Sequence, residues 1–462
     1  MKKFFSRLFL WYLRLAARLQ LAKVRPRIIA LTGSVGKTSL RNALGAVLKD
    51  RFRIKVSEKA NSETGLPLDI LGLHPQTYSV GDWLRLSLLI PIKLLTNWEK
   101  YDFYIAELGV DDPFPPKNMS YLLTFIKPEI AIFLSVAPVH TQQFEKLVGR
   151  KKFRSPAEKN SFLLKAIARE KGRLVVSLPK DKKALINIDD KLVLAEGKKS
   201  RAQLYFFGRS AGNKNQTARL KPTCFLKTTS YQLFSRGTSF GYQYQRQKAQ
   251  LKVNYLLPEY YGSTFGAALL TGLILGFSLK EAVSSLAGNF SLPPGRMSLF
   301  KGIKGTILID SSYNASRRSV LGALEMLNRL GQRTGRNRIF VFGDMRELGN
   351  EAKREHRLVA KEIIFSADRL VLIGPLTKKW IWPLVKDKLQ AQWFPNSFQA
   401  ADWLKNHLAG REIILVKGSQ NTIFTEIVTE ALLADKNEAI KLCRRGKFWH
   451  KQRQRYVRAE NE

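Results

Sequence analysis

The stretch IIALTGSVGKTSLRNAL, residues 28–44, joins a short apolar run to two glycines and a lysine. Residues 28–32 are typical of a short buried strand, and we expect a helix to begin at about Thr38. A strand, a glycine-bearing loop and a helix in this order are the setting of a phosphate-binding loop. The usual Walker spacing places a glycine at position 31, where this chain has Leu31, so the motif is a shortened variant.

The loop residues predict how a phosphorylated ligand is held. Gly33 and Gly36 let the backbone wrap around an anion, so that successive N–H groups form a concave nest. Lys37 would reach the terminal phosphates, and Thr38 would place its hydroxyl on Mg²⁺ at a helix N-terminus. The alternative is a chance glycine-rich turn. The predicted nucleotide-binding residues of this loop are Gly33, Ser34, Gly36, Lys37, Thr38 and Ser39.

The charge balance limits the partners. The 462 residues include 78 Lys and Arg against 37 Asp and Glu, a formal net charge of +41. Such a surface attracts nucleic acid, anionic lipid or phosphorylated small molecules. Because the basic residues are spread along the whole chain, we expect no specific nucleic-acid recognition. The only two cysteines, Cys224 and Cys443, argue against a disulfide framework or a four-cysteine zinc site and favour a cytoplasmic protein.

The first 27 residues predict a basic amphipathic helix. Arg7, Arg14 and Arg18 fall on one helical face, while apolar residues from Phe4 to Leu19 fill another. The arginines exclude a transmembrane helix, and no cleavage site of a signal peptide follows. Two alternatives stay open: residues 1–25 contact the inner face of an anionic membrane, or they dock on the domain behind them. Residues 82–98 are expected to form a buried helix broken at Pro91 rather than a second membrane-contacting segment.

The remaining pattern predicts an α/β protein with two main domains. Apolar runs at 101–109 and 128–136 indicate parallel strands, and residues 155–172 indicate a helix. Strands are expected at 172–179 and 183–190, and residues 200–257 favour small antiparallel strands. Four strand-then-loop units after residue 297 are typical of a doubly wound domain. We therefore predict a P-loop central ATPase domain with a parallel sheet and a smaller antiparallel sheet, followed by a Rossmann-like C-terminal domain. The predicted boundaries are 1–27 for the N-terminal helix, 28–297 for the central domain, 298–435 for the C-terminal domain and 436–462 for a basic tail.

A series of short motifs stands in the order seen in Mur ligases. The motifs are TGSVGKTS, NSETGLP (61–67), AELG (106–109), VAPVH (136–140), AREKGRLV (168–175), NIDD (187–190), PPGRM (293–297), IDSSYNAS (309–316), GDMRELG (343–349) and KGS (417–419). They cover roughly residues 28–435 and most resemble the branch that adds D-alanyl-D-alanine to the cell-wall precursor peptide. GDMRELG followed by His356 is the most branch-specific part. The resemblance implies an ADP-forming ligase that uses ATP and Mg²⁺ to join a muramoyl-peptide carboxylate to D-alanyl-D-alanine through an acyl phosphate.

The resemblance also implies roles for single residues. Glu107 and His140 match metal-binding residues of the family, and Lys171 stands where several members carry a carbamylated lysine. Plain alternatives are a strand-end carboxylate, a structural histidine and an exposed helical lysine. The implied catalytic residues are Lys37, Glu107, His140, Lys171 and Arg296, and the implied metal ligands are Thr38, Glu107, His140 and Lys171. The implied nucleotide contacts of the later motifs are Arg296, Asp310, Tyr313 and Asn314, and the implied substrate contacts are Asn61, Thr64, Asp344, Glu347 and Lys417.

Three departures from the family pattern stand out. Only about 27 residues precede the first strand, so the domain that holds the UDP-sugar is expected to be missing. Tyr260 and Thr264 replace the usual His/Asn pair, and Gln420 stands where an arginine usually follows the serine. Two other functions therefore remain open. One is a related ligase that acts on a different or lipid-linked carboxylate at the membrane, and the other is a non-catalytic nucleotide-dependent scaffold of envelope enzymes.

Overall fold

Two β-sheets organise the chain in the computed structural model, which describes residues 2–58, 60–138, 141–149, 151–209, 225–234, 237–419 and 423–458. The first sheet has nine strands in the order β2-β3-β1-β4-β5-β6-β7-β8-β9. Its strands are β1 (Arg27–Thr32), β2 (Ile54–Val56), β3 (Phe103–Glu107), β4 (Ile130–Phe133), β5 (Lys183–Asn187), β6 (Gln203–Gly208), β7 (Phe225–Leu233), β8 (Thr238–Tyr244) and β9 (Gln247–Val253). The second sheet has six strands in the order β10-β11-β15-β12-β13-β14. They are β10 (Ser298–Lys301), β11 (Ile307–Ser311), β12 (Arg338–Gly343), β13 (Arg369–Ile373), β14 (Gln390–Phe394) and β15 (Ile413–Lys417).

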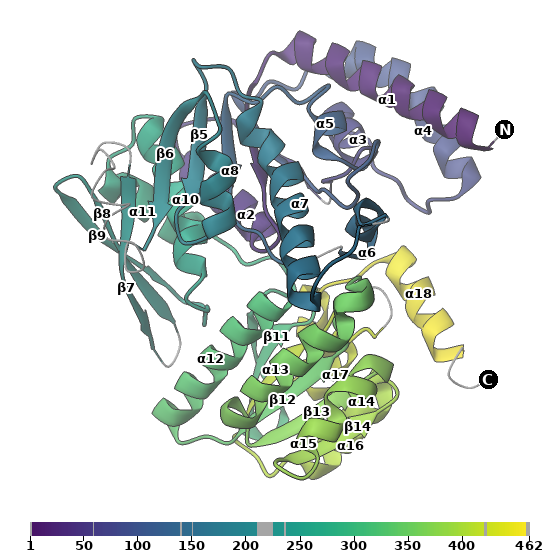
Figure 1. The fold of residues 1–462 in the computed structure, drawn as a ribbon, viewed down its shortest axis with the longest axis vertical. Coiled ribbons are helices and arrows are strands. Elements are labelled where there is room, and N and C mark those ends of the chain that lie inside the picture. Colours follow the sequence, from purple (N-terminus) through teal and green to yellow (C-terminus); the bar gives the residue numbers. More distant parts are fainter. Residues whose placement is uncertain are drawn as a thin grey trace.

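Strand β1 lies inside the first sheet, parallel to both β3 and β4. Its apolar residues alternate between two cores, because successive side chains of a strand point to opposite faces. Ile29 and Leu31 join the core with α2 (Lys37–Leu48), α10 (Tyr261–Ile274) and α11 (Leu279–Asn289). Ile28 and Ala30 join the core with α7 (Pro156–Val176) and α8 (Lys191–Gly197). Helices therefore cover both faces of the sheet (Figure 1).

The predicted antiparallel strands continue this first sheet. Strand β7 pairs in parallel with β6, and β8 and β9 follow in antiparallel order. In the second sheet only β10 is antiparallel to its neighbour, and helices again pack on both faces. These helices are α12 (Arg317–Thr334), α13 (Ala352–Ser366), α14 (Pro375–Trp380), α15 (Trp382–Val385), α16 (Ser397–His407) and α17 (Glu426–Leu432). The predicted α/β class with a doubly wound second unit is confirmed.

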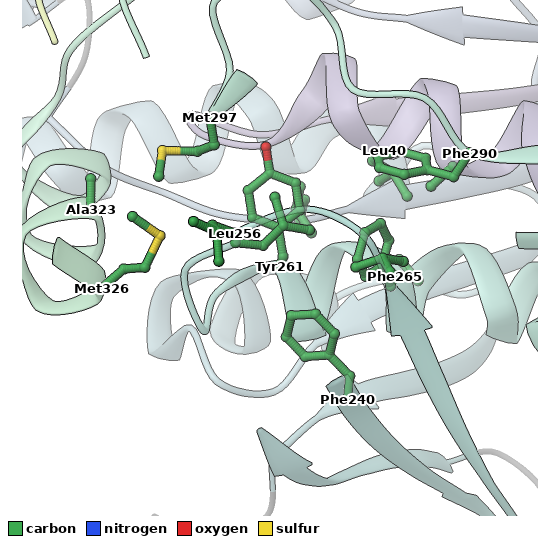
Figure 2. Packing of buried hydrophobic residues seen from close by; sticks show 14 of the residues in the cluster. Leu40, Phe240, Leu256, Tyr261, Phe265, Phe290, Met297, Ala323 and Met326 are labelled. Carbon is green, nitrogen blue, oxygen red and sulfur yellow. The ribbon is translucent and has the colours of Figure 1, made fainter. Parts of the chain in front are cut away.

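One hydrophobic core connects the phosphate-loop helix with the second sheet. Figure 2 shows Tyr261 of α10 among Leu40 of α2, Met326 of α12 and Met297, which directly precedes β10. All four side chains are buried or nearly so. Because this core is shared, the first helix of the second unit packs directly against elements of the first. The two sheets are thus held close enough for their loops to share a site.

Two apolar segments differ from their predictions. Residues 172–176 continue helix α7 instead of starting a strand, because Leu163, Ile167, Leu174 and Val175 recur at helical spacing on its buried side. Residues 80–96 form helix α4 (Val80–Thr96), which keeps Pro91 inside it. Of its apolar side chains only Leu86 and Ile90 are buried. The prediction of a buried helix broken at the proline was therefore wrong.

The first and last described elements are both helices and lie on the same side of the molecule (Figure 1). Helix α1 (Lys2–Val24) packs against α4 and α3 (Gly65–Leu71). Two short helices, α5 (Met119–Leu122) and α6 (Thr141–Phe144), come later in the first unit. Helix α18 (Lys447–Arg458) ends the described chain. Short 3-10 turns lie at Glu145–Leu147, Ile303–Gly305, Gly349–Glu351 and Lys436–Lys441. No described helix combines the length and apolar character needed to cross a bilayer.

Candidate functional site

A polar cavity of about 260 Å³ lies between the two sheets. One wall is the loop after β1 together with the end of β3 and the start of α10, and the other is the loop after β11 with the end of β15. Ligand sites of parallel α/β sheets occupy this position, outside the carboxyl ends of the strands. The predicted residues that line the cavity are Ser34, Gly36, Lys37, Thr38, Ser39, Asn61, Glu107, Arg296, Tyr313, Asn314 and Lys417.

The loop between β1 and α2 is held in shape by glycine and by one serine. Gly36 has a φ of 87°, and a Cβ at this position would lie 2.9 Å from Leu134 Cδ2. A side chain is therefore excluded on two grounds, the left-handed backbone and the lack of space. The Ser135 hydroxyl accepts from Val35 N–H and donates to Val35 carbonyl, each at 2.9 Å. Ser135 thus anchors the loop.

Lys37 begins helix α2 and bends back over the loop. Its Nζ donates to the Gly33 carbonyl at 2.9 Å. Burial lowers the pKa of Lys37, while the nearby carboxylates of Glu107 and Asp111 act in the opposite direction. An anionic ligand beside this amine would favour the protonated form, because opposite charge stabilises an ammonium group.

Thr38 connects the two walls of the cavity. Its hydroxyl lies 3.3 Å from Glu107 Oε1, to which it donates, and accepts from Arg296 Nη2 at 3.0 Å. Glu107 ends β3, and its backbone N–H donates to the Ser57 hydroxyl at 2.9 Å. Arg41 lies 3.9 Å from the other carboxylate oxygen of Glu107. The hydroxyl of Thr38 and the carboxylate of Glu107 are hard oxygen donors of the kind that Mg²⁺ prefers.

The wall from the second unit is cationic. The Arg296 guanidinium lies over the Tyr313 ring, 4.4 Å from its centroid. The Lys417 ammonium donates to Ser311 Oγ at 3.1 Å and to the Asn314 carbonyl at 3.0 Å. Burial lowers the pKa of Lys417 to about 7, and the neighbouring Arg296 adds to the effect. The site therefore presents positive charge from both walls.

Asp310 lies behind this wall rather than on it. Its side chain is fully buried, and its Oδ1 accepts from Ser312 N–H and from the Thr429 hydroxyl. Burial raises the pKa of Asp310. Its contacts support the loop that carries Tyr313, so the predicted nucleotide contact at position 310 lies one layer away from the cavity.

Lys171 is also buried beside the cavity rather than exposed on its helix. Its Nζ donates to the Val110 carbonyl at 3.3 Å, close to cavity-lining Gly109 and Asp111. Burial, together with the charge of Lys37, lowers the pKa of Lys171 to about 7. The alternative of a solvated helical lysine is therefore wrong.

Some of the predicted substrate contacts line the cavity and others lie away from it. Asn61 lines the cavity, and its carbonyl accepts from Gly109 N–H at 2.7 Å. Thr64 instead precedes α3, with its hydroxyl 3.4 Å from the Ser62 hydroxyl. Asp344 is buried and accepts from the backbone N–H groups of Leu376 and Thr377 at the start of α14, so it supports that helix.

Three other positions complete the predicted set. Glu347 is exposed, with a φ of 62°, and is not among the described residues that line the cavity. His140 and Gln420 lie outside the described residues. Gly33 contributes its carbonyl to Lys37 through the contact given above.

Several cavity residues were not predicted as site residues. Tyr260 stacks on Tyr261 with 5.2 Å between ring centroids, and the Tyr261 hydroxyl lies 3.1 Å from Ser39 Oγ. Asp111, Ser316 and Ser319 also line the cavity. Asp111 follows the AELG motif closely, so its position after a strand end was the available signal. Both serines sit at the start of α12: Ser316 ends the IDSSYNAS motif, which was its signal, whereas Ser319 lies beyond the motif and had none.

The C-terminal segment also reaches the site. Arg444 forms a buried ion pair with Glu426 at 2.5 Å. Its guanidinium donates to the carbonyls of Ser312 at 2.9 Å and Tyr313 at 2.8 Å. Composition predicted only a basic tail at residues 436–462, because a sequence rich in lysine and arginine does not show which of these residues is buried.

Known proteins match the chain along most of its length. Residues 295–420 match the sequence model of the Mur ligase, glutamate ligase domain. The UDP-N-acetylmuramoyl-tripeptide–D-alanyl-D-alanine ligase of Escherichia coli (strain K12) is 25% identical over 415 residues, covering 88% of this chain and 77% of that protein. The enzyme of the same name from Rickettsia prowazekii (strain Madrid E) is 23% identical over 410 residues, covering 87% and 78%.

A solved structure shares the fold over an even larger part of the chain. The MurF ligase from Thermotoga maritima in complex with ADP aligns with a TM-score of 0.71 at 18% identity, covering 96% of this chain and 84% of that one. The glutamate ligase domain, the sequence relatives and the shared fold agree with one another. Residues 295–420 thus match the glutamate ligase domain of Mur ligases, and the chain is similar over most of its length to the D-alanyl-D-alanine ligases named above.

Proposed function

We propose that this chain is an ATP-dependent ligase that joins a muramoyl-peptide carboxylate to D-alanyl-D-alanine and releases ADP and phosphate. The observation that carries the proposal is the cavity between the sheets. It combines a phosphate loop and Glu107 on one wall with Arg296 and Lys417 on the other. The names of the sequence relatives supply the substrate class.

In the first step a carboxylate oxygen attacks the γ-phosphorus of ATP, the bond to the ADP oxygen breaks, and an acyl phosphate forms. Both reactants are anions, so the step needs positive charge fixed at the point of transfer. Lys37 and Arg296 supply it from opposite walls. Because burial lowers the pKa of Lys37, the phosphates of ATP would restore its proton on binding.

In the second step the amine nitrogen of the dipeptide attacks the activated carbonyl carbon, and the carbon–oxygen bond to phosphate breaks. The amine loses one proton, and the departing phosphate is a base that can take it. Lys417 lies on the wall opposite the phosphate loop and is held by Ser311 and Asn314. It would stabilise the negative charge that develops on the leaving group.

Mg²⁺ fits the oxygen donors of Thr38 and Glu107, which lie 3.3 Å apart beside the phosphate loop. Bound there with phosphate oxygens, the ion would neutralise charge and orient the reacting groups. The described residues contain no cluster of three His, Cys, Asp or Glu side chains able to hold a metal by themselves. We therefore propose that the nucleotide completes the coordination.

Lys171 would add a further oxygen ligand after reaction with CO₂. The neutral amine attacks the carbon of CO₂, a proton is released, and a carbamate with two oxygens replaces a cation. A pKa of about 7 keeps a large fraction of the amine neutral at physiological pH. The reaction also removes the repulsion between two buried ammonium groups, since the charge of Lys37 acts on Lys171.

The direct test is phosphate release from ATP with purified chain. We expect turnover only when UDP-N-acetylmuramoyl-tripeptide and D-alanyl-D-alanine are both present. Lys37→Ala should abolish turnover, whereas Lys49→Ala, an exposed lysine at the end of the same helix, should leave it intact. Nucleotide binding without turnover on any carboxylate and amine pair would instead support the non-catalytic scaffold. Turnover only with a lipid-linked carboxylate would correct the acceptor and keep the chemistry.

A further inference from the structure

The exposed apolar side chains of the described chain are concentrated on helices α1 and α4. Eleven large apolar side chains lie exposed between Leu8 and Trp98, and only five others, for a total of sixteen, are spread over the remaining described residues. Helix α1 contributes Leu8, Trp11, Leu15 and Leu19. Helix α4 contributes Val80, Leu84, Leu88, Ile92 and Leu95. We call these nine residues the α1–α4 face.

The two helices run parallel and side by side. Phe9 packs edge-on against Trp83 near their starts, and Gln20 Nε2 donates to the Asn97 carbonyl near their ends. Between these contacts the Tyr12 hydroxyl donates to the Ser87 carbonyl. Figure 1 shows the pair along one edge of the molecule, away from the second sheet.

Helical spacing places both apolar stripes on one side of this pair. On α1 the exposed residues recur every three or four positions and lie next to Tyr12, which faces α4. On α4 they recur in the same way and lie next to Ser87, which faces α1. In two parallel right-handed helices these positions turn toward the same side, so the stripes join into one surface. Contiguous exposed apolar patches of this kind mark an interaction site.

The edges of the face are basic. Arg7, Arg14 and Arg18 follow one another along α1 on the side away from α4. Helix α1 contains no acidic residue, and the only one on α4, Asp82, is buried and paired with Arg85. The whole chain carries a net charge of +41. An apolar face with a basic rim is complementary to an anionic lipid surface, where apolar groups enter the boundary and arginines contact headgroups.

We propose that the α1–α4 face docks the protein on an anionic bilayer. The helices would lie in the interface, with Trp11 and Trp98 at the headgroup level where indole rings are favoured. Helix α4 adds five exposed apolar side chains to the four that α1 alone would offer. The proposal does not depend on the ligase activity, since docking concerns a surface outside the cavity.

The test is flotation of the full chain with vesicles of phosphatidylglycerol and phosphatidylcholine, compared with vesicles of phosphatidylcholine alone. We expect preferential binding to the anionic vesicles. Leu88→Asp with Leu95→Asp should weaken it more than about tenfold, because two exposed leucines no longer enter the apolar boundary. Arg7→Gln with Arg18→Gln should weaken it by about a factor of five per arginine.

A matched control separates docking from general attraction to a cationic protein. Phe365→Asp with Ile440→Asp makes the same charge change at residues that are 74% and 80% exposed elsewhere. This control should bind vesicles as the unchanged chain does, and thermal unfolding should show that both double variants are folded. Equal binding by the Leu88/Leu95 variant, or equal loss in the control, would overturn the proposal. The proposal would also be overturned if the unchanged chain did not bind vesicles but formed a dimer in solution that the Leu88/Leu95 variant abolished. The face would then be the contact with a second copy.

Discussion

Replacing Arg444 by methionine should destabilise the loop with Tyr313, which lines the cavity. Arg444 and Glu426 form an ion pair in which the side chains are 2% and 0% exposed, so solvent screens it very little. Removing one partner of such a pair leaves an uncompensated buried charge and costs about 3–5 kcal/mol. The substitution also removes the donors to the carbonyls of Ser312 and Tyr313.

Hydrogen exchange at β11 and α17 measures this cost locally. A loss of about 3–5 kcal/mol corresponds to exchange faster by roughly two to three and a half powers of ten where the opening of this unit limits exchange. Nucleotide affinity should fall as well, because the loop with Tyr313 lines the cavity. A matched change, Arg445→Met, removes a partly exposed guanidinium from Glu430, which Arg453 still contacts, and should cost less than about 1 kcal/mol.

A substitution of Glu426 and a change of pH test this explanation. Burial raises the pKa of Glu426, and Arg444 opposes that rise. Without Arg444 the folded state should bind a proton at Glu426 more tightly than the unfolded state, so the penalty should shrink as pH falls. Arg444→Met with Glu426→Leu should recover much of the loss, since no buried charge remains. A penalty below 1 kcal/mol, or one unchanged between pH 8 and pH 5 and in the double variant, would refute the reasoning.

Three further outcomes test the cavity itself. Gly36→Ala should cost about 1–2 kcal/mol of backbone strain and displace Leu134, so nucleotide affinity measured by fluorescence titration should drop. The control Gly288→Ala in α11, where a Cβ meets nothing within 4 Å, should be neutral or stabilising. ATP binding at alkaline pH should take up a proton, since the phosphates raise the lowered pKa of Lys37, and calorimetry in buffers of different ionisation enthalpy should lose this uptake in Lys37→Ala. Carbon-13 bicarbonate should give a carbamate signal in nuclear magnetic resonance that Lys171→Ala removes, and a spectrum unchanged by this substitution would contradict carbamate formation at Lys171.

The phosphate-loop wall could be predicted from the sequence because its signals are local. A glycine with a positive φ, a lysine at the helix start and a glutamate at a strand end each follow from short spacing, and Gly36, Lys37 and Glu107 all line the cavity. The four strand-then-loop units after residue 297 were predictable for the same reason, since apolar strands alternate with helices in a doubly wound sheet.

The parts that depend on tertiary contact could not be predicted in this way. Arg444 is one of 78 basic residues, and only the fold shows that it is paired with Glu426. Asp310 and Asp344 stand in motifs, yet burial turns one toward Thr429 and the other toward the start of α14. Helix α4 looked buried because it is apolar, although the composition of a helix does not tell which of its faces has a partner.

The charges of the cavity explain why the two walls need each other. Lys37 begins the helix that follows β1 of the first sheet, Lys417 ends β15 of the second, and burial lowers the pKa of both amines. The charge of Arg296 contributes to this effect on each, because a nearby guanidinium disfavours a protonated amine. A polyanion that enters the cavity reverses the balance on both walls at once. Its binding would favour protonation of both lysines, and separating the sheets would then weaken the hold on the phosphates.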